Sequence, residues 1–99
     1  MPKQRLDRGS RHRIEAGQTL APVYLSSCPA SIAASPGQGG SLLVEYTLSQ
    51  RQLIENGQTL WHAWPAGSVT EPTVDALLTP VIAIRATAQG ADGFIEIVE

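Results

Sequence analysis

Two β-rich runs close the sequence: Pro80-Val81-Ile82-Ala83-Ile84-Arg85-Ala86-Thr87-Ala88 and Phe94-Ile95-Glu96-Ile97-Val98, separated by Gln89-Gly90-Ala91-Asp92-Gly93. β-branched residues favour strands, and Gly and Asp favour the turn between them, so the pattern predicts a β-hairpin. Successive side chains of a strand point to opposite faces. One face of the first run therefore carries Ile82, Ile84, Ala86 and Ala88, opposite Arg85 and Thr87. In the second run Ile95 and Ile97 share a face, opposite Glu96.

A hairpin with one apolar face is marginally stable in water and needs a second layer of structure. The 99-residue chain is 42% hydrophobic, which is typical of one globular domain. Turn residues divide it into about six to eight short strands, a spacing typical of sandwiches and small barrels. We therefore predict an all-β fold, a small antiparallel β-sandwich of the jelly-roll or Ig-like kind. Residues 1–10 are predicted as an extended basic arm, and residues 11–99 as the single sandwich domain.

The best strand of the first half is predicted at residues 41–48, where apolar and polar side chains alternate. Residues 49–56 are interpreted as a loop or a strand extension, although Ser49 is a possible cap for one helical turn. Residues 74–78 are predicted to form a brief helical turn after Thr73. These assignments are local and leave the sheet topology open.

Trp61 and Trp64 are predicted to point in opposite directions, because an odd separation places two residues on opposite faces of a strand. A buried indole contributes strongly to a core, and an exposed one is a common anchor at protein interfaces. We favour Trp61 as the core residue and Trp64, beside the turn at Pro65, as the interface residue.

Charge is distributed unevenly along the chain. Residues 1–13 hold five basic residues and one acidic residue, whereas residues 14–99 hold two basic and eight acidic ones. A basic arm on an acidic body favours a negatively charged partner surface. The arm residues predicted to bind this partner are Lys3, Arg5, Arg8, Arg11 and Arg13. Nucleic acid is an improbable partner, since the body lacks a basic stripe or an aromatic platform.

Two decapeptides that lie forty residues apart resemble each other: residues 11–20 (RHRIEAGQTL) and residues 51–60 (RQLIENGQTL). Seven of the ten positions are identical, and the match ends immediately afterwards. Each copy can end one element at its glycine and begin another at Thr-Leu. Either an internal duplication or the repeated use of one turn explains this pattern.

No catalytic or metal-binding motif is present. His12, His62 and Cys28 are the only residues of their types and lack the spacing of a zinc site. Cys28 cannot form a disulfide within the chain, and no serine lies in a nucleophile-elbow motif. No apolar run is long enough for a membrane span or a signal peptide. We therefore expect a protein that has no enzymatic activity, cofactor or membrane association. We also expect that it is synthesised and folds in a cytoplasm.

The second half of the chain resembles small structural proteins of tailed bacteriophages. The similarity covers roughly residues 57–99. It consists of the Trp-rich segment Trp61-His62-Ala63-Trp64-Pro65-Ala66-Gly67-Ser68-Val69-Thr70, the apolar strand with a single Arg85, the Gly/Asp turn and the terminal strand. It implies a virion protein assembled in the host cytoplasm, most plausibly a capsid decoration (cement) protein. It assigns no function to single residues.

The resemblance implies that the partner is the major capsid protein or another virion protein. It also implies that this protein forms a homo-oligomer on the shell, with a trimer as the favoured state. The arginines of the arm would then pair with carboxylates of the shell. Two other interpretations remain open. One is a tail, neck or head-fibre component with a binding role, including a sugar- or receptor-binding sandwich that uses Trp64. The other is a small nucleic-acid-binding module that uses the arm.

Overall fold

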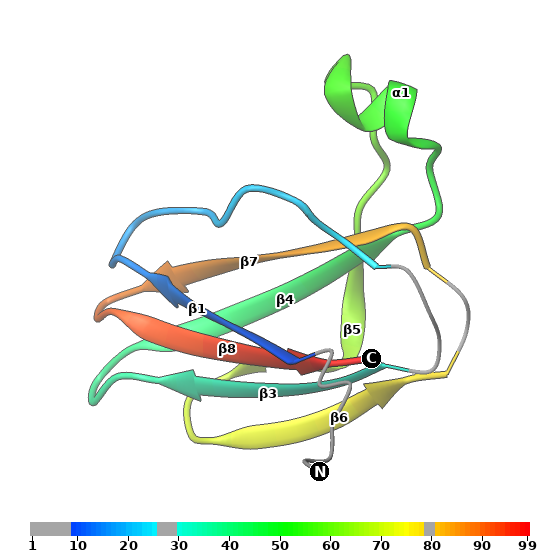
Figure 1. Cartoon of the computed structure of the whole chain (residues 1–99). Coiled ribbons are helices and arrows are strands. Elements are labelled where there is room, and N and C mark those ends of the chain that lie inside the picture. The colour runs from blue at the N-terminus through cyan, green and yellow to red at the C-terminus, as the bar shows by residue number, and fades with distance from the viewer. Residues whose placement is uncertain (1–8, 26–29, 79–80) are drawn as a thin grey trace, which may run out of the picture.

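The computed structural model describes residues 9–25, 30–78 and 81–99. In this part of the chain, eight antiparallel strands form two sheets stacked face to face, and one short helix lies in a connection between two strands (Figure 1). The elements, in chain order, are β1 (Gly9–Ile14), β2 (Val23–Tyr24), β3 (Ala30–Pro36), β4 (Ser41–Thr47), α1 (Arg51–Glu55), β5 (His62–Val69), β6 (Thr73–Leu77), β7 (Ala83–Gln89) and β8 (Gly93–Val98). The predicted β-sandwich is confirmed.

The strand order identifies the kind of sandwich. Sheet A has the order β1-β8-β3-β6, and sheet B has the order β2-β7-β4-β5. Apart from β4 and β5, consecutive strands lie in different sheets, and this alternation is the arrangement of a jelly roll. In an Ig-like domain the first two strands share a sheet, whereas β1 and β2 here do not. Of the two predicted alternatives, the jelly roll is therefore the one that forms.

The predicted hairpin of the last two strands is wrong, although both strands form. β7 pairs with β2 and β4 in sheet B, and β8 pairs with β1 and β3 in sheet A. The turn between them therefore crosses from one sheet to the other. Alternation along each run gives the buried face of a strand but does not say which strand is its neighbour. Here the two apolar faces lie opposite each other across the core instead of side by side.

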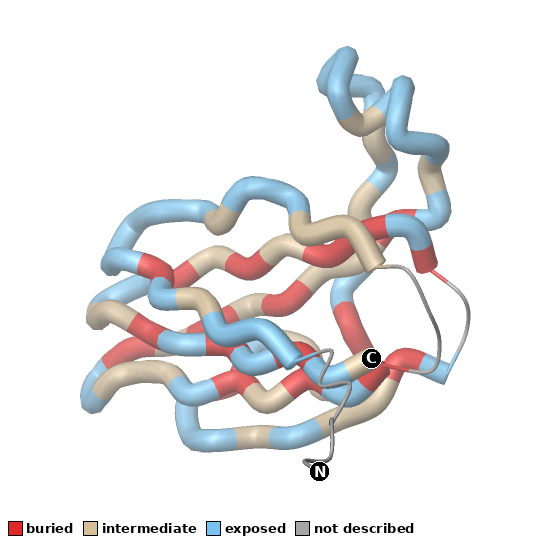
Figure 2. Tube along the Cα trace, viewed as in Figure 1, coloured by how far each residue is buried: buried red, intermediate tan, exposed pale blue. Residues whose placement is uncertain are grey.

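The core lies between the sheets, where buried positions alternate along the strands (Figure 2). Ile84 and Ala86 of β7 and Ile95 and Ile97 of β8 are almost fully buried, as the alternation predicts. The larger cluster that they join also contains Ile14, Ile32, Ala34, Leu42, Val44, Trp64, Val69, Leu77, Val81 and Ala88. Ile82, predicted on the same face as Ile84, is 38% exposed because it precedes the start of β7.

Two local assignments from the sequence are reversed in the structure. Residues 51–55 form the short helix α1 instead of a loop or strand, and Gln50 is its N-cap in place of Ser49. Residues 73–77 form β6 instead of a helical turn, since they pair with β3 at the edge of sheet A. For residues 73–77, pairing with β3 outweighs the local preference for a turn.

We predict that two isoleucines of the same run differ sharply in their effect on stability. Ile84→Ala should lower the free energy of unfolding by about 2–5 kcal/mol, because a fully buried side chain leaves a cavity. Ile82→Ala is the matched control and should cost less than about 1 kcal/mol, as expected for a site near the surface. Denaturant unfolding of the two variants measures the difference, and equal losses would contradict the observed facing.

Candidate functional site

The structure changes the boundary of the predicted arm. β1 begins at Gly9, and Gly9 and Ser10 pair with Val98 and Ile97 of β8. The last two residues assigned to the arm thus belong to the sandwich. Lys3, Arg5 and Arg8 lie outside the described residues. Arg11 and Arg13 lie in β1, which is an edge strand of sheet A.

Arg11 and Arg13 already contact side chains of their own chain. The Arg11 guanidinium lies 5.0 Å from the centre of the Phe94 ring, and Arg13 forms an ion pair with Asp92. Asp92 Oδ1 also accepts a hydrogen bond of 2.9 Å from the backbone N–H of Ala16. This hydrogen bond and the one from Arg13 hold the pKa of Asp92 below its usual value. Arg11 therefore packs on β8, and Arg13 joins β1 to the turn after β7.

The predicted facing of the two tryptophans is wrong. Trp64 is only 2% exposed and belongs to the core, where its Nε1–H donates a hydrogen bond of 2.6 Å to the Gly67 carbonyl. Trp61 precedes β5 and lies partly exposed on the outer side of sheet B. One indole lies in the core and the other on the outer side of sheet B. Trp64 is the buried one because β5 continues through Pro65 instead of ending there. Trp64 is thus excluded as an interface residue.

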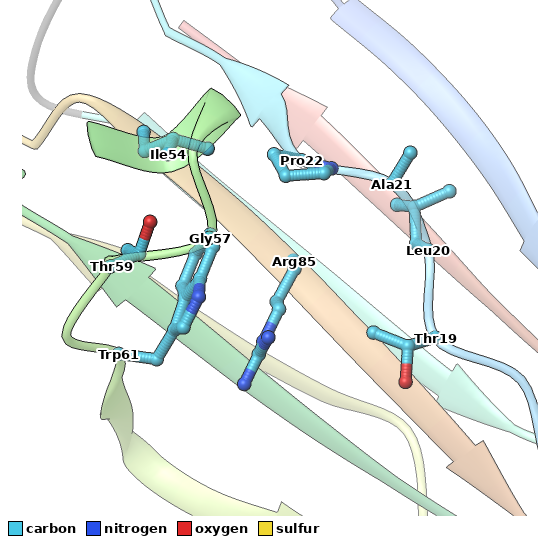
Figure 3. Close-up of a pocket in the computed structure, with 9 residues that line it drawn as sticks. All are labelled: Thr19, Leu20, Ala21, Pro22, Ile54, Gly57, Thr59, Trp61 and Arg85. Carbon is cyan, nitrogen blue, oxygen red and sulfur yellow. The ribbon is translucent and has the colours of Figure 1, made fainter. Parts of the chain in front are cut away.

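A pocket of about 450 Å³ lies on the outer side of sheet B, beside Trp61. One wall comes from the segment before β2 and the other from the connection between α1 and β5, with Arg85 of β7 between them (Figure 3). The lining residues are Thr19, Leu20, Ala21, Pro22, Ile54, Gly57, Thr59, Trp61 and Arg85. This volume lies within the range of about 300–1,000 Å³ that is usual for small-molecule sites.

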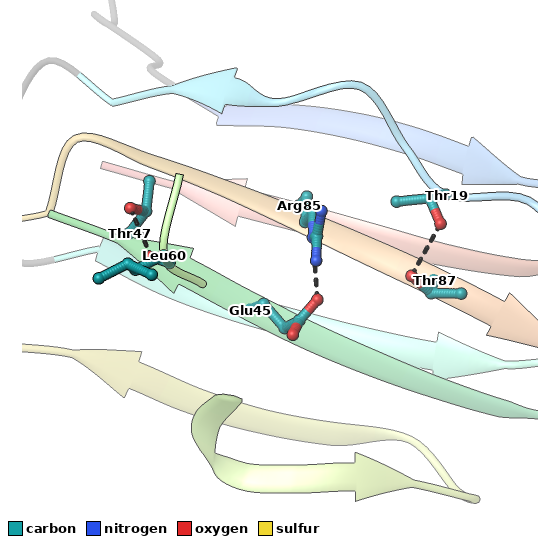
Figure 4. Close-up of polar contacts among 6 residues, drawn as sticks. All are labelled: Thr19, Glu45, Thr47, Leu60, Arg85 and Thr87. Atoms are coloured by element: carbon teal, nitrogen blue, oxygen red, sulfur yellow. Dashed lines mark hydrogen bonds and ion pairs between the residues drawn. The ribbon is translucent and has the colours of Figure 1, made fainter. Parts of the chain in front are cut away.

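The polar contacts between β4 and β7 give the pocket a rigid base (Figure 4). Arg85 Nε donates a hydrogen bond of 2.9 Å to Glu45 Oε1, and the two residues are directly opposite in the sheet register. The Arg85 guanidinium also lies 4.4 Å from the centre of the Trp61 ring. Beside them, the hydroxyls of Thr19 and Thr87 are 3.0 Å apart. Arg85 is therefore held by an acid on one side and an aromatic ring on the other.

A buried threonine holds the second wall in place. Thr47 is fully buried at the end of β4, and its hydroxyl donates a hydrogen bond of 2.8 Å to the Leu60 carbonyl. The same oxygen accepts a hydrogen bond of 3.0 Å from the Ser49 N–H. Both ends of the connection that carries α1 are thus tied to one side chain. Arg51 of α1 lies 4.3 Å from the Tyr24 ring centre, which joins the helix to β2.

The two similar decapeptides meet at this pocket, with Thr19 and Leu20 on one wall and Gly57 and Thr59 on the other. Their secondary structures differ, since the first copy continues from β1 into a turn and the second contains α1. Both copies place glycine in the left-handed region, with φ of 81° at Gly17 and 73° at Gly57. The shared feature is therefore one glycine turn used in two settings.

The sequence does not predict this pocket. The favoured assignment places Trp61 in the core, and Arg85 is only the single outward charge of an apolar strand. The repeated Gly-Gln-Thr-Leu was the one available signal, but nothing in the sequence indicates that its two copies face each other. The pocket also contains an unpartnered polar atom, because Thr59 Oγ1 is buried and has no hydrogen-bond partner among the described residues.

The chain matches no family model, no curated protein and no solved structure. Within residues 9–25, 30–78 and 81–99, no three His, Cys, Asp or Glu side chains gather in a way that could hold a metal ion. No helix in that same part of the chain has the length and apolar character to cross a bilayer. The features that bear on function are therefore those of the two outer faces of the sandwich.

We predict that Asp92 makes stability depend on pH in the acid range. Folding lowers the pKa of this carboxyl, so it stabilises the native state at pH values above the pKa of the unfolded chain, which is 3.8. This contribution is lost as the pH falls through the lower pKa of the folded protein. Asp92→Asn should therefore lower the denaturation midpoint at neutral pH and have little effect well below pH 3.8.

The measurement is a series of denaturant midpoints of both proteins across this range. Glu71→Gln removes one exposed carboxylate elsewhere and serves as the control. Parallel pH profiles of the parent protein and Asp92→Asn would contradict the role assigned to Asp92.

Proposed function

We propose that this protein is a virion structural protein, most specifically a capsid decoration (cement) protein that docks on the shell through the outer face of sheet A. The observation that carries the proposal is the apolar character of that face, whose large side chains are exposed among the described residues. The outer face of sheet A is defined here by the outward side chains of β3, β6 and β8: Ser31, Ala33, Ser35, Val74, Ala76, Phe94, Glu96 and Val98.

Large apolar side chains on this face are exposed. Val74 is 73% exposed and Val98 is 53% exposed, and Phe94 is exposed on the same strand as Val98. Between them stand small residues, since Ala33 lies opposite both Val74 and Glu96 in the register. Exposed apolar patches on a small soluble domain commonly mark sites of protein–protein interaction. Small side chains between the larger ones also permit close approach of a flat partner.

Charge supports a protein partner better than a nucleic acid. The four arginines in the described ranges each contact their own chain: Arg11 lies on Phe94, Arg13 pairs with Asp92, Arg51 with Glu55 and Arg85 with Glu45. On the outer face of sheet A, Glu96 is directly opposite Arg11 in the register. A face with balanced charge gives little attraction for a phosphate backbone, which requires clustered basic residues.

The proposed mechanism is mechanical. Each copy adds buried area across capsid subunits, so shell rupture must also break its contacts. Lys3, Arg5 and Arg8 precede β1, the edge strand of the same sheet, and would add ion pairs with shell carboxylates. Exposed ion pairs contribute about 0–1 kcal/mol each, so many copies and several contacts per copy supply the strength. The jelly roll occurs in viral capsid proteins and also in lectins, and this analogy supports the proposal at the level of fold alone.

The test is the binding of purified protein to virus particles isolated from its host, quantified by mass spectrometry against the major capsid protein. Cement predicts a fixed ratio to capsid subunits and later DNA release on heating. Val74→Lys should abolish binding without unfolding the domain, because Val74 is exposed in an edge strand and a lysine there is tolerated. Ser68→Lys adds the same charge to the exposed surface of β5 in sheet B and should bind normally.

A handful of copies per particle would instead indicate a tail, neck or head-fibre component. Equal binding by the two lysine variants would contradict docking through sheet A. Full occupancy with an unchanged temperature of DNA release would contradict cementing itself.

A further inference from the structure

The pocket on sheet B has no role in the proposed docking, since it lies on the other sheet of the sandwich. We infer that this pocket is a binding site for a neutral carbohydrate, a sugar unit whose hydroxyls accept hydrogen bonds from Arg85 while its C–H surface packs against the apolar wall. The inference stands independently of the capsid proposal, and it uses Trp61 in place of the buried Trp64.

The first argument is the unused hydrogen-bonding capacity in the pocket. A guanidinium has five N–H donors, and the one hydrogen bond of Arg85 to other described residues uses Nε. The terminal amino groups therefore remain available as donors. A ligand hydroxyl oxygen that accepts hydrogen bonds would use these donors.

The second argument is charge. Glu45 lies 2.9 Å from Arg85 and offsets its charge, so the base of the pocket is formally neutral. The pair is partly buried, with 32% of the Arg85 side chain and 18% of the Glu45 side chain exposed. An anionic ligand would have to compete with Glu45 for the guanidinium. A neutral hydroxyl accepts from the free donors of Arg85 without disturbing the ion pair.

The third argument is the apolar part of the lining. Leu20 and Pro22 stand on one side of Arg85, and Ile54 and Trp61 stand on the other (Figure 3). Sugar rings combine C–H surface with hydroxyl groups, so they match a site with an aromatic or aliphatic wall and a few fixed polar groups. The ion pair and the Trp61 contact hold Arg85 in place before a ligand arrives, which reduces the cost of ordering it.

The test uses nuclear magnetic resonance of the full-length chain, with two arms of probes. The neutral arm contains D-glucose, D-galactose, D-mannose and N-acetyl-D-glucosamine, and the anionic arm contains N-acetylneuraminic acid, acetate and inorganic phosphate. The indole N–H signals of Trp61 and Trp64 are assigned with Trp61→Phe. We expect at least one neutral sugar to shift the Trp61 signal and the amides of residues 19–22 saturably, while the buried Trp64 signal stays in place.

Trp61→Ala is the informative variant, because it removes the aromatic part of the wall and the contact that holds Arg85. It should abolish the saturable shifts at residues 19–22. Thr70→Val changes an exposed side chain outside the pocket and should bind like the parent protein.

Three results would overturn the inference. They are the absence of saturable shifts with every neutral sugar, binding that is confined to the anionic arm, and sugar binding that Trp61→Ala leaves unchanged. None of these results bears on binding to virus particles through sheet A. The two proposals therefore fail separately.

Discussion

The structure depends on the burial of the apolar faces of β7 and β8 in the one core between the sheets. Each is an inner strand of its own sheet, with β7 between β2 and β4 and β8 between β1 and β3. Ile84 and Ile95 are both fully buried in the same cluster. The turn between these strands joins the two sheets covalently at one end of the sandwich (Figure 1). The remaining strands add to either side of β7 and β8, and all consecutive strands except β4 and β5 alternate between the sheets.

The same arrangement leaves two outer faces that differ in character. On the outer side of sheet A, the exposed Val74 and Val98 stand among small residues. Sheet B is partly covered by the connection that carries α1, which Thr47 ties down at both ends. The long connection exists only between β4 and β5, the one pair of consecutive strands within a single sheet. One face can thus offer area to a flat partner, while the other offers a pocket.

Electrostatics in this small domain is local. The basic start and the acidic body suggest a separation of charge, but the arginines of the described ranges are matched one by one with Asp92, Glu55, Glu45 or the Phe94 ring. Arg13 and Asp92 are 79 positions apart in sequence and become neighbours because β1 lies beside β8. The described residues include four arginines and eight carboxylates, so pairing neutralises the arginines and leaves the sandwich with a net negative charge.

The sequence by itself determined the fold class and the identity of most core residues in the last two strands. These features follow from alternation with a period of two, which is a property of the single strand. The sequence also shows no recognised catalytic motif, because such motifs require particular residues at particular spacings that the chain lacks. Of the six candidate residues, Lys3, Arg5 and Arg8 fall outside the described part of the chain, and Trp64 is buried because β5 continues through Pro65.

Only the tertiary structure decided which strands are neighbours, which tryptophan is buried, and that two similar decapeptides face each other across a pocket. A turn such as residues 89–93 is compatible with a hairpin or with a crossing between sheets, and the choice depends on where β7 and β8 bury most apolar area. Likewise, Arg85 is a lone charge in the sequence and becomes part of a site through Glu45 and Trp61. Such contacts arise from long-range pairing, and local sequence patterns do not encode the partner in that pairing.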